Sequence, residues 1–225
     1  MKRCVLGLGV LLLAALLLAG CSASGMKNVE RTGFLSSYSD LKPGTGDQAA
    51  MRYLKPGVDF KPYNKLMFER FVVLLSDSAA SRQIDPAMLK ELTDYYQNAV
   101  FNAVKGGYEI VDQPGPGVAR VRIAITELKP SNPTANTLSS IVPIGIAVSA
   151  ATKATSGDNL GTGEAGTEFE MLDSVTGERL MAAMDKRQGG KGVFRGKWED
   201  TKEAFDYWAK RFRQQLDLAR GVAAK

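Results

Sequence analysis

Two segments of the chain, residues 118–128 and 162–173, alternate between apolar and polar side chains with a period of two. Successive side chains of a β-strand point to opposite faces of the sheet, so this alternation is typical of strands with one buried face. A turn at residues 174–177 and a third extended segment at 178–186 follow directly, which predicts a hairpin. A chain with this pattern must build an antiparallel sheet and cover one of its faces.

Two amphipathic helices are predicted to provide that cover. The first begins at Asp85-Pro86, an N-cap acid followed by proline at the first helical position, and ends at Gly106-Gly107. Its predicted buried face consists of Leu89, Leu92, Tyr96, Ala99 and Ala103. The second spans residues 198–220, and its predicted buried face consists of Trp198, Thr201, Phe205, Trp208, Phe212, Leu216 and Ala219. The expected fold class is therefore α+β: a two-layer sandwich of a mainly antiparallel sheet with a central helix and a C-terminal amphipathic helix.

Shorter patterns complete the expected fold. Residues 65–75 are rich in Phe, Val and Leu, which predicts one strand buried on much of both faces, and residues 108–112 predict a short strand. Residues 33–44 carry apolar side chains at helical spacing before Pro43-Gly44, which predicts a short helical turn docked on the domain. Residues 47–62 are predicted to be extended and loop-like.

The first 21 residues have the layout of an export signal. Lys2 and Arg3 precede an uncharged apolar run, residues 5–18, which is shorter than the roughly 20 residues that a membrane-spanning helix needs. The run ends in Leu18-Ala19-Gly20-Cys21, which resembles the lipobox of bacterial lipoproteins. The resemblance implies cleavage between Gly20 and Cys21, a diacylglycerol group on the Cys21 sulfur and acylation of the new amine.

Cleavage at this point sets the chemistry of the mature chain. Cys4 leaves with the signal and Cys21 carries lipid, so no disulfide is expected. The loss of two basic residues lowers the formal net charge from +5 to +3, because the signal contains no acidic residue. This charge is too small to indicate a nucleic-acid partner. By resemblance to Gram-negative lipoproteins, Ser22 in place of aspartate favours the outer membrane, with the domain on its periplasmic face.

The expected organisation is a signal peptide (1–20), a lipidated tether with a short docking segment (21–50), and a single α+β domain (51–225) with an apolar insertion (129–161). Two interpretations of the insertion stay open. Residues 137–155 could form local cover for one end of the sheet, or a surface that enters the membrane or packs against identical subunits. The side chains that would make the second kind of contact are Ile141, Val142, Ile144, Ile146 and Val148.

No pattern in the chain predicts catalysis or a cofactor. Histidine is absent, which excludes Ser-His-Asp and Cys-His catalysis and His-based zinc sites. Residues 161–166 match G-x-G-x-x-G, but a strand follows where a dinucleotide site needs a helix, so these glycines are expected to form a turn. Glu164, Glu168, Glu170 and Asp173 form a carboxylate cluster that is expected to be a solvated or salt-bridged face, with Arg120 and Arg122 opposite Glu168 and Glu170. We expect no catalytic, cofactor-binding or metal-binding residue.

Several stretches resemble an uncharacterised family of bacterial lipoproteins, the domain of unknown function DUF3313. The matching stretches are Gly33-Phe34-Leu35 with Tyr38 and Leu41-Lys42-Pro43, residues 55–60, Tyr63-Asn64-Lys65-Leu66-Met67, Gly163-Glu164-Ala165, Glu168, residues 173–178, Trp198, and Ala204-Phe205-Asp206-Tyr207-Trp208. The resemblance covers most of residues 33–216 and implies neither an activity nor catalytic residues.

The function expected from these features is that of a non-enzymatic, lipid-anchored periplasmic envelope protein that acts in envelope assembly or protein interaction. Its expected partners are the membrane, through the lipid on Cys21, and an envelope protein or further copies of itself. The alternative is a subunit of a membrane-inserted oligomeric ring or transport complex that uses residues 137–155. In outline, a lipoprotein with an α+β sheet and an apolar insertion is similar to the curli-secretion pore lipoproteins. A third alternative is a carbohydrate-acting enzyme that uses Glu168, Glu170 or Asp173.

Overall fold

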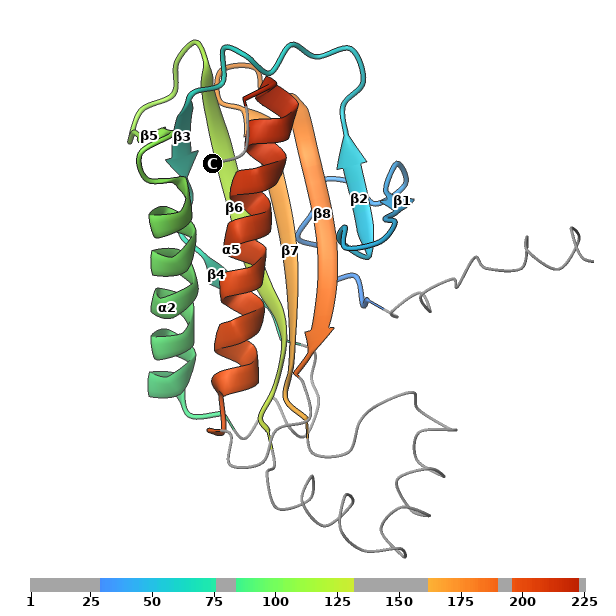
Figure 1. Cartoon of the computed structure of the whole chain (residues 1–225), viewed down its shortest axis with the longest axis vertical. Coiled ribbons are helices and arrows are strands. Elements are labelled where there is room, and N and C mark those ends of the chain that lie inside the picture. The colour runs from blue at the N-terminus through green and yellow to red at the C-terminus, as the bar shows by residue number, and fades with distance from the viewer. Residues whose placement is uncertain (1–28, 76–83, 132–161, 190–195, 223–225) are drawn as a thin grey trace, which may run out of the picture.

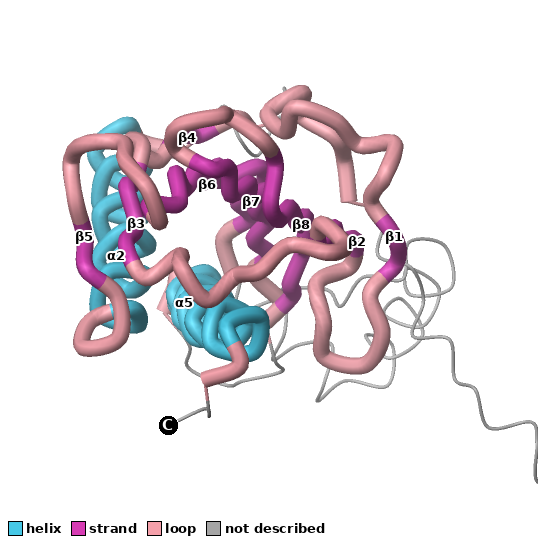
Figure 2. Tube along the Cα trace, turned by 90° about the horizontal axis from the view of Figure 1, so that it is seen from above, coloured by secondary structure: helices cyan, strands magenta, loops and turns pink. Residues whose placement is uncertain are grey.

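An open mixed sheet forms one layer of the structure, and two helices pack on one face of it (Figure 1). The computed structural model describes residues 29–75, 84–131, 162–189 and 196–222, and all elements and contacts below belong to these residues. Seen from above, both helices lie on the same side of the central strands (Figure 2). The predicted α+β fold class is confirmed.

The elements in chain order are β1 (Lys42–Pro43), β2 (Met51–Leu54), β3 (Lys65–Phe68), β4 (Val72–Val73), α2 (Pro86–Val104), β5 (Glu109–Ile110), β6 (Val118–Lys129), β7 (Glu164–Asp173), β8 (Arg179–Gln188) and α5 (Glu199–Arg220). The strands pair in the order β1-β2-β8-β7-β6-β3-β5, and β4 also pairs with β6. The pairs that involve β3 and β4 are parallel, and the others are antiparallel. The segment predicted as a loop at residues 47–62 thus contributes one strand, β2, to the sheet.

The predicted hairpin is formed by β7 and β8. The two strands pair antiparallel along almost their whole length, with an irregularity between Met171 and Leu172. Gly177 closes the turn with φ of 73°, a left-handed conformation that glycine adopts without steric cost. β6 pairs with the other side of β7, so the two alternating segments lie next to each other in the sheet.

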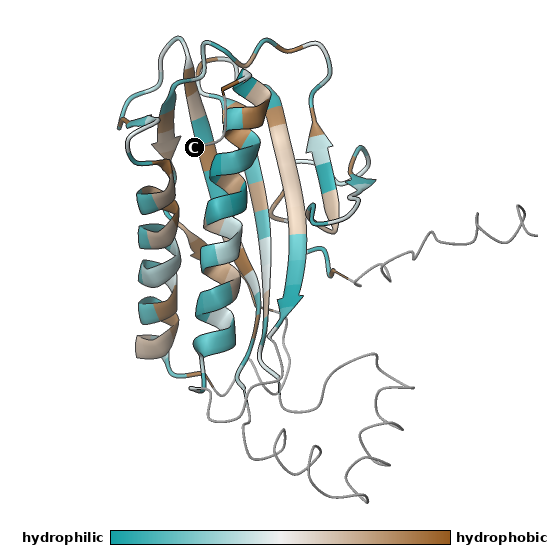
Figure 3. Cartoon of the chain, in the orientation of Figure 1, coloured by the Kyte–Doolittle hydropathy of each residue, from teal (hydrophilic) through white to brown (hydrophobic). Residues whose placement is uncertain are grey.

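The core lies between the sheet and the helices, where aromatic rings from both helices meet. Tyr96 of α2 stacks on Phe205 of α5 with ring centroids 4.4 Å apart, and Trp208 packs near both rings. The sheet contributes the apolar side chains of β6 that the alternation predicted, namely Ala119, Val121, Ile123 and Ile125. In Figure 3 the visible outer side of α5 is mostly hydrophilic, as expected of an amphipathic helix.

The start of α2 is confirmed, but its buried face is rotated from the predicted one. Asp85 accepts a hydrogen bond from the amide of Ala87 (2.8 Å), which makes it the N-cap. The buried residues of α2 are Leu92, Tyr96, Val100 and Val104. Leu89, Ala99 and Ala103 are only partly buried, because α2 packs beside α5 as well as on the sheet and the two alanines line the groove between the helices.

Residues 65–75 form two short strands, so the prediction of one continuous strand is wrong. β3 pairs with residues 118–121 of β6, and β4 pairs with residues 124–125. Phe68 and Val72 pair with Val121 and Ala124 of β6. The stretch between Phe68 and Val72 is one residue longer than the stretch between these partners, so the ladder is interrupted there, as at a β-bulge.

Residues 29–41, called the N-terminal segment below, cover the face of the sheet opposite the helices. Leu35 and Leu41 are buried against β8, so the predicted docking is confirmed. The predicted helical turn is wrong, since the segment consists of bends and turns that lead into β1. The reason is that the amides of Thr32 and Ser36 donate hydrogen bonds to carboxylates of the sheet instead of to helical carbonyls.

Candidate functional site

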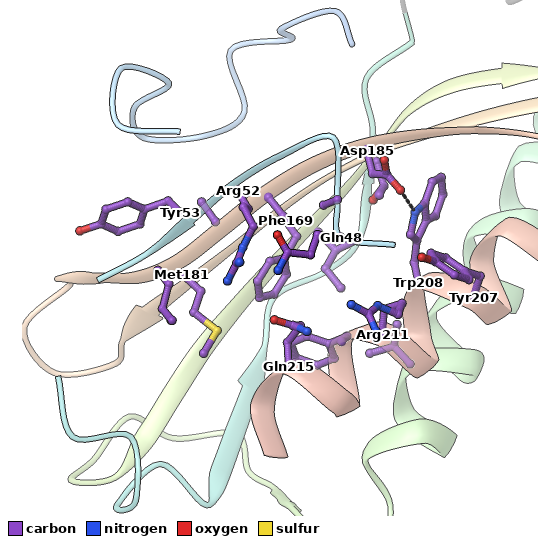
Figure 4. Close-up of a pocket in the computed structure, with 18 of the residues that line it drawn as sticks. Gln48, Arg52, Tyr53, Phe169, Met181, Asp185, Tyr207, Trp208, Arg211 and Gln215 are labelled. Atoms are coloured by element: carbon purple, nitrogen blue, oxygen red, sulfur yellow. Dashed lines mark hydrogen bonds between the residues drawn. The ribbon is translucent and has the colours of Figure 1, made fainter. Parts of the chain in front are cut away.

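A cavity of about 390 Å³ lies on the helical face of the sheet, where β8 and β2 extend past α5 (Figure 4). A helix with its side chains is about 10–12 Å wide and strands lie about 4.8 Å apart, so two helices cover roughly four or five strands. α2 and α5 pack on the part of the sheet from β4 to β8, and among the described residues no helix covers β2. Residues 47–49 and the C-terminal half of α5 enclose the resulting groove.

The inner wall of this pocket is apolar. Ile123 of β6, Phe169 of β7 and Met181 of β8 line it from the sheet. Phe212 and Ala219 line it from α5, and the rings of Phe169 and Phe212 meet edge to face at 5.0 Å. A pocket of this size and lining is typical of sites for small molecules, whose volumes are about 300–1,000 Å³.

Polar contacts hold the two sides of the pocket at a fixed distance. Asp185 of β8 is 6% exposed and accepts hydrogen bonds from the indole Nε1 of Trp208 (2.8 Å) and the amide of Ala50 (3.0 Å). Arg211 of α5 forms an ion pair with Asp47 (2.9 Å). These contacts join the loop after β1 to both the sheet and α5, so the pocket is preformed.

Arg52 of β2 differs from the other charged groups that line the pocket. Its side chain points into the pocket in Figure 4, where the amides of Gln48 and Gln215 lie close to it. Within the described part of the chain, Arg52 has no ion pair or hydrogen-bond partner, whereas Arg211 and Asp185 are both satisfied. The pocket therefore combines apolar walls with one uncompensated positive charge.

The carboxylates that the sequence analysis considered lie on the opposite face of the sheet. Glu168 and Glu170 of β7 are 0% exposed because the N-terminal segment covers them. Glu168 accepts hydrogen bonds from the hydroxyl of Tyr38 (2.7 Å) and the amide of Thr32 (3.0 Å). Burial, and after it the hydrogen bond to Glu168, raises the pKa of Tyr38. The prediction of a solvated face is wrong for these two residues: Glu168 is held by hydrogen bonds to the N-terminal segment, and Glu170 follows the salt-bridged alternative.

Glu170 is the centre of this buried network. It accepts hydrogen bonds from Ser36 and forms ion pairs with Arg122 (2.5 Å) and Arg179 (3.8 Å). The pairing predicted between Arg122 and Glu170 is confirmed. The pairing predicted between Arg120 and Glu168 is wrong, because the register places these residues opposite Leu172 and Ala124 respectively.

Asp173 has a structural role in the turn after β7. It accepts hydrogen bonds from the amides of Val175 (3.0 Å) and Thr176 (2.7 Å) and from the hydroxyl of Tyr63 (2.9 Å). Burial alone would raise the pKa of Asp173, but these hydrogen bonds lower it overall. Burial and the contact with Asp173 raise the pKa of Tyr63 to about 12.

The glycines of the G-x-G-x-x-G match are explained by close packing rather than by the predicted turn. β7 begins at Glu164, inside the match. A Cβ on Gly163 would lie 2.7 Å from Ser131 Oγ, and a Cβ on Gly166 would lie 2.7 Å from Thr126 Oγ1. No helix begins there in the described residues, so the pattern has no phosphate-binding geometry.

A feature that sequence reasoning missed is the fixed base of the insertion. Asp200, in the first turn of α5, accepts hydrogen bonds from Ser131 Oγ (2.7 Å) and the amide of Gly163 (2.8 Å). Ser131 and Gly163 flank the undescribed residues 132–161, so one buried carboxylate holds both ends of the insertion together. The sequence shows an aspartate in the first turn of a predicted amphipathic helix, but no local pattern indicates its partners, which are far away along the chain.

The predicted lipidation and contact residues lie outside the described part of the chain. They are Gly20 and Cys21 at the cleavage site, and Ile141, Val142, Ile144, Ile146 and Val148 in the insertion. Among the described residues, no group of three or more Cys, Asp or Glu side chains is placed to hold a metal ion. None of the helices described is both long and apolar enough to cross a bilayer.

Comparisons with known proteins agree with the resemblance noted in the sequence. The family described as "Protein of unknown function (DUF3313)" matches residues 30–212. The uncharacterized lipoprotein YdcL of Escherichia coli K12 is 23% identical over 176 residues, which are 77% of this chain and 78% of YdcL. This relative is a lipoprotein, which agrees with the family resemblance.

Solved structures resemble the chain only distantly. A PelC dodecamer from Paraburkholderia phytofirmans has a TM-score of 0.38 and 11% identity, covering 77% of this chain and 97% of that one. A homologue of a neuraminyllactose-binding hemagglutinin from Helicobacter pylori has a TM-score of 0.41 and 9% identity, covering 72% and 87%.

The buried network predicts a large loss of stability in Glu170→Gln. This change removes the buried negative charge between Arg122 and Arg179 and leaves them only their more exposed partners, Glu69 and Asp40. Breaking a buried ion pair costs about 3–5 kcal/mol. We expect urea unfolding, followed by tryptophan fluorescence, to show a loss of about 3 kcal/mol, and trypsin to cut after Arg31 more rapidly. Glu178→Gln is the matched control, because its ion pair with Lys55 is more exposed and contributes at most about 1 kcal/mol. Equal losses in the two variants would contradict the role of the network.

Proposed function

This chain belongs to the DUF3313 family, and we propose that it is a non-enzymatic, lipid-anchored binding module at the periplasmic face of the outer membrane. Cys21 carries the lipid, Ser22 directs the protein to the outer membrane, and the folded domain presents its pocket and surface to envelope components. It acts by tethering, which raises the local concentration of the domain near its partner.

The docking of the N-terminal segment is the observation that carries this proposal. The segment that directly follows the tether is fixed to the sheet by Glu168 and Glu170 rather than free. Residues 22–28 separate Cys21 from Val29, and these eight steps of about 3.3–3.6 Å span at most roughly 30 Å. The domain therefore works next to the membrane surface and cannot reach far into the periplasm.

The carboxylate geometry supports a non-enzymatic role. The paired carboxylates on β7 are covered and bonded to the N-terminal segment, whereas glycosidase carboxylates must reach a sugar from two sides. The carboxylate of Asp173 holds a turn. Glu168 and Glu170 thus hold the segment nearest the anchor on the sheet.

Lipidation is tested at Cys21. In cells given labelled palmitate, we expect the wild-type protein to take up the label and to sediment with membranes, because acyl chains on Cys21 anchor it. Cys21→Ala is expected to lose both properties. Cys4→Ala is the matched control and is expected to behave as wild type, because Cys4 leaves with the signal peptide. Labelling of Cys21→Ala would refute the assigned anchor.

Membrane choice is tested at Ser22. We expect the wild-type protein in the outer-membrane fraction of a density gradient, and Ser22→Asp in the inner-membrane fraction. Ser24→Asp adds the same charge two positions later and is expected to remain with the outer membrane. An unchanged distribution of Ser22→Asp would mean that this position does not direct sorting in the organism of origin.

A second candidate function is a subunit of a membrane-inserted ring or transport complex. The observation that favours it is the base formed by Asp200, Ser131 and Gly163, which holds the two ends of the insertion at one place on the domain. A base of this kind can present the apolar residues 137–155 to a neighbouring subunit or a membrane.

The mass of the lipidated protein in mild detergent separates the two candidates. From the tethered module we expect light scattering, with detergent subtracted, to give a single protomer near the chain mass, and deletion of residues 137–155 to leave that mass unchanged. A large closed homo-oligomer that falls to a protomer on deletion would support the ring instead. The unfolding free energy of the deletion variant shows whether the domain itself remains folded.

A further inference from the structure

We propose that the pocket between α5 and the β2–β8 edge binds a fatty acid, with the carboxylate at Arg52 and the acyl chain along the apolar wall. This inference adds a ligand class to the proposed binding module. It depends on the pocket alone and not on the membrane to which the protein is anchored.

Arg52 provides the recognition of the anionic head group. Its guanidinium points into the pocket (Figure 4) and has no ion pair or hydrogen-bond partner in the part of the chain that the structure describes. A positive charge against apolar walls is costly without a counter-ion, and a planar guanidinium matches a carboxylate with two parallel hydrogen bonds. Arg211 is already neutralised by Asp47, so only one anionic group is needed.

Two amides extend the polar end of the site. Gln48 and Gln215 line the pocket beside Arg52. Gln48 Oε1 accepts a hydrogen bond from the amide of Thr45 (3.0 Å), which orients its Nε2 as a donor. A guanidinium with an amide donor beside it favours an acceptor with several lone pairs, such as a carboxylate.

The apolar part of the pocket is long and extends into the core. On α5 the lining residues extend from Tyr207 to Ala219, which at 1.5 Å per residue is about 18 Å of helix. Val100 of α2 and Ile123 of β6, both buried core residues, line its inner part. An unbranched acyl chain fits a long cavity enclosed between a helix and a sheet, whereas a folded protein surface reaches only its rim.

The proposal is tested by calorimetric titration of laurate into the mature full chain, made without lipid as the Cys21→Ser variant. We expect one binding site, and an affinity at least about tenfold lower after Arg52→Gln, because a charge-assisted pair is lost. Arg70→Gln removes an exposed arginine far from the pocket and is expected to bind as the parent does. Dodecanol, which has the same chain length without the charge, is expected to bind at least about tenfold more weakly.

A second measurement places the acyl chain. Trp208 lines the pocket and Trp198 does not, so a brominated fatty acid is expected to quench the fluorescence of a Trp198→Phe variant but not of a Trp208→Phe variant. Ala183 lies beside Arg52 on the neighbouring strand, and Ala183→Phe is expected to fill the pocket and abolish binding while Arg52 is retained.

The outcomes that overturn the proposal are an absence of laurate binding, equal affinities for laurate and dodecanol, or an Arg52→Gln variant that binds as the parent does. Unfolding free energies of the variants show whether a loss of binding reflects a loss of folding. Because lipidation and sorting are measured in cells with other variants, failure of this proposal is distinct from failure of the anchoring proposal.

Discussion

The sheet is wider than the two helices that pack on it, and the arrangement of the rest of the molecule depends on this difference. α2 and α5 bury the apolar face of the central strands, and among the described residues no helix covers β2. The loop after β1 closes this region through Asp185 and the Asp47–Arg211 pair, which leaves a pocket beside α5. The same loop leads back to the N-terminal segment, so the pocket and the attachment of the tether belong to one continuous piece of chain.

The other face of the sheet has an unusual cover, because it buries charge rather than apolar surface alone. Glu168 and Glu170 receive donors from the N-terminal segment and from arginines of β6 and β8. Buried ion pairs add little net stability compared with apolar packing, but they are costly to break. Such a network therefore specifies where the segment docks more than how tightly the domain folds. It gives the segment next to the lipid anchor one position on the sheet.

The helices and the loop after β1 cover one face of the sheet, and the N-terminal segment covers the other. This arrangement indicates how the parts act together in the proposed module. The tether between Cys21 and the domain is short, and the N-terminal segment that follows it is fixed on one face of the sheet. In the proposed module the orientation of the domain relative to the membrane is therefore restricted. The pocket lies near the edge of the opposite face, lined by apolar side chains and by Arg52. A fatty acid that leaves a nearby bilayer would meet a preformed apolar site with a counter-ion. Preformed sites bind without the cost of ordering a loop, which favours affinity for the ligand.

The sequence by itself determined the α+β class, the β7–β8 hairpin and the start of α2, because local periodicity and turn chemistry decide these features. It also indicated that Arg122 would meet Glu170. The export signal stays a prediction, because residues 1–28 lie outside the described part of the chain. The tertiary structure alone decided that these carboxylates are buried, that residues 65–75 divide into two strands, and that Asp200 joins the ends of the insertion. The tertiary structure alone also decided the pocket. The loop at 47–49 and β2 reach it only because β2 pairs with β8, more than 120 positions later in the chain. Contacts at such distances depend on register and packing, which no local pattern of residues encodes.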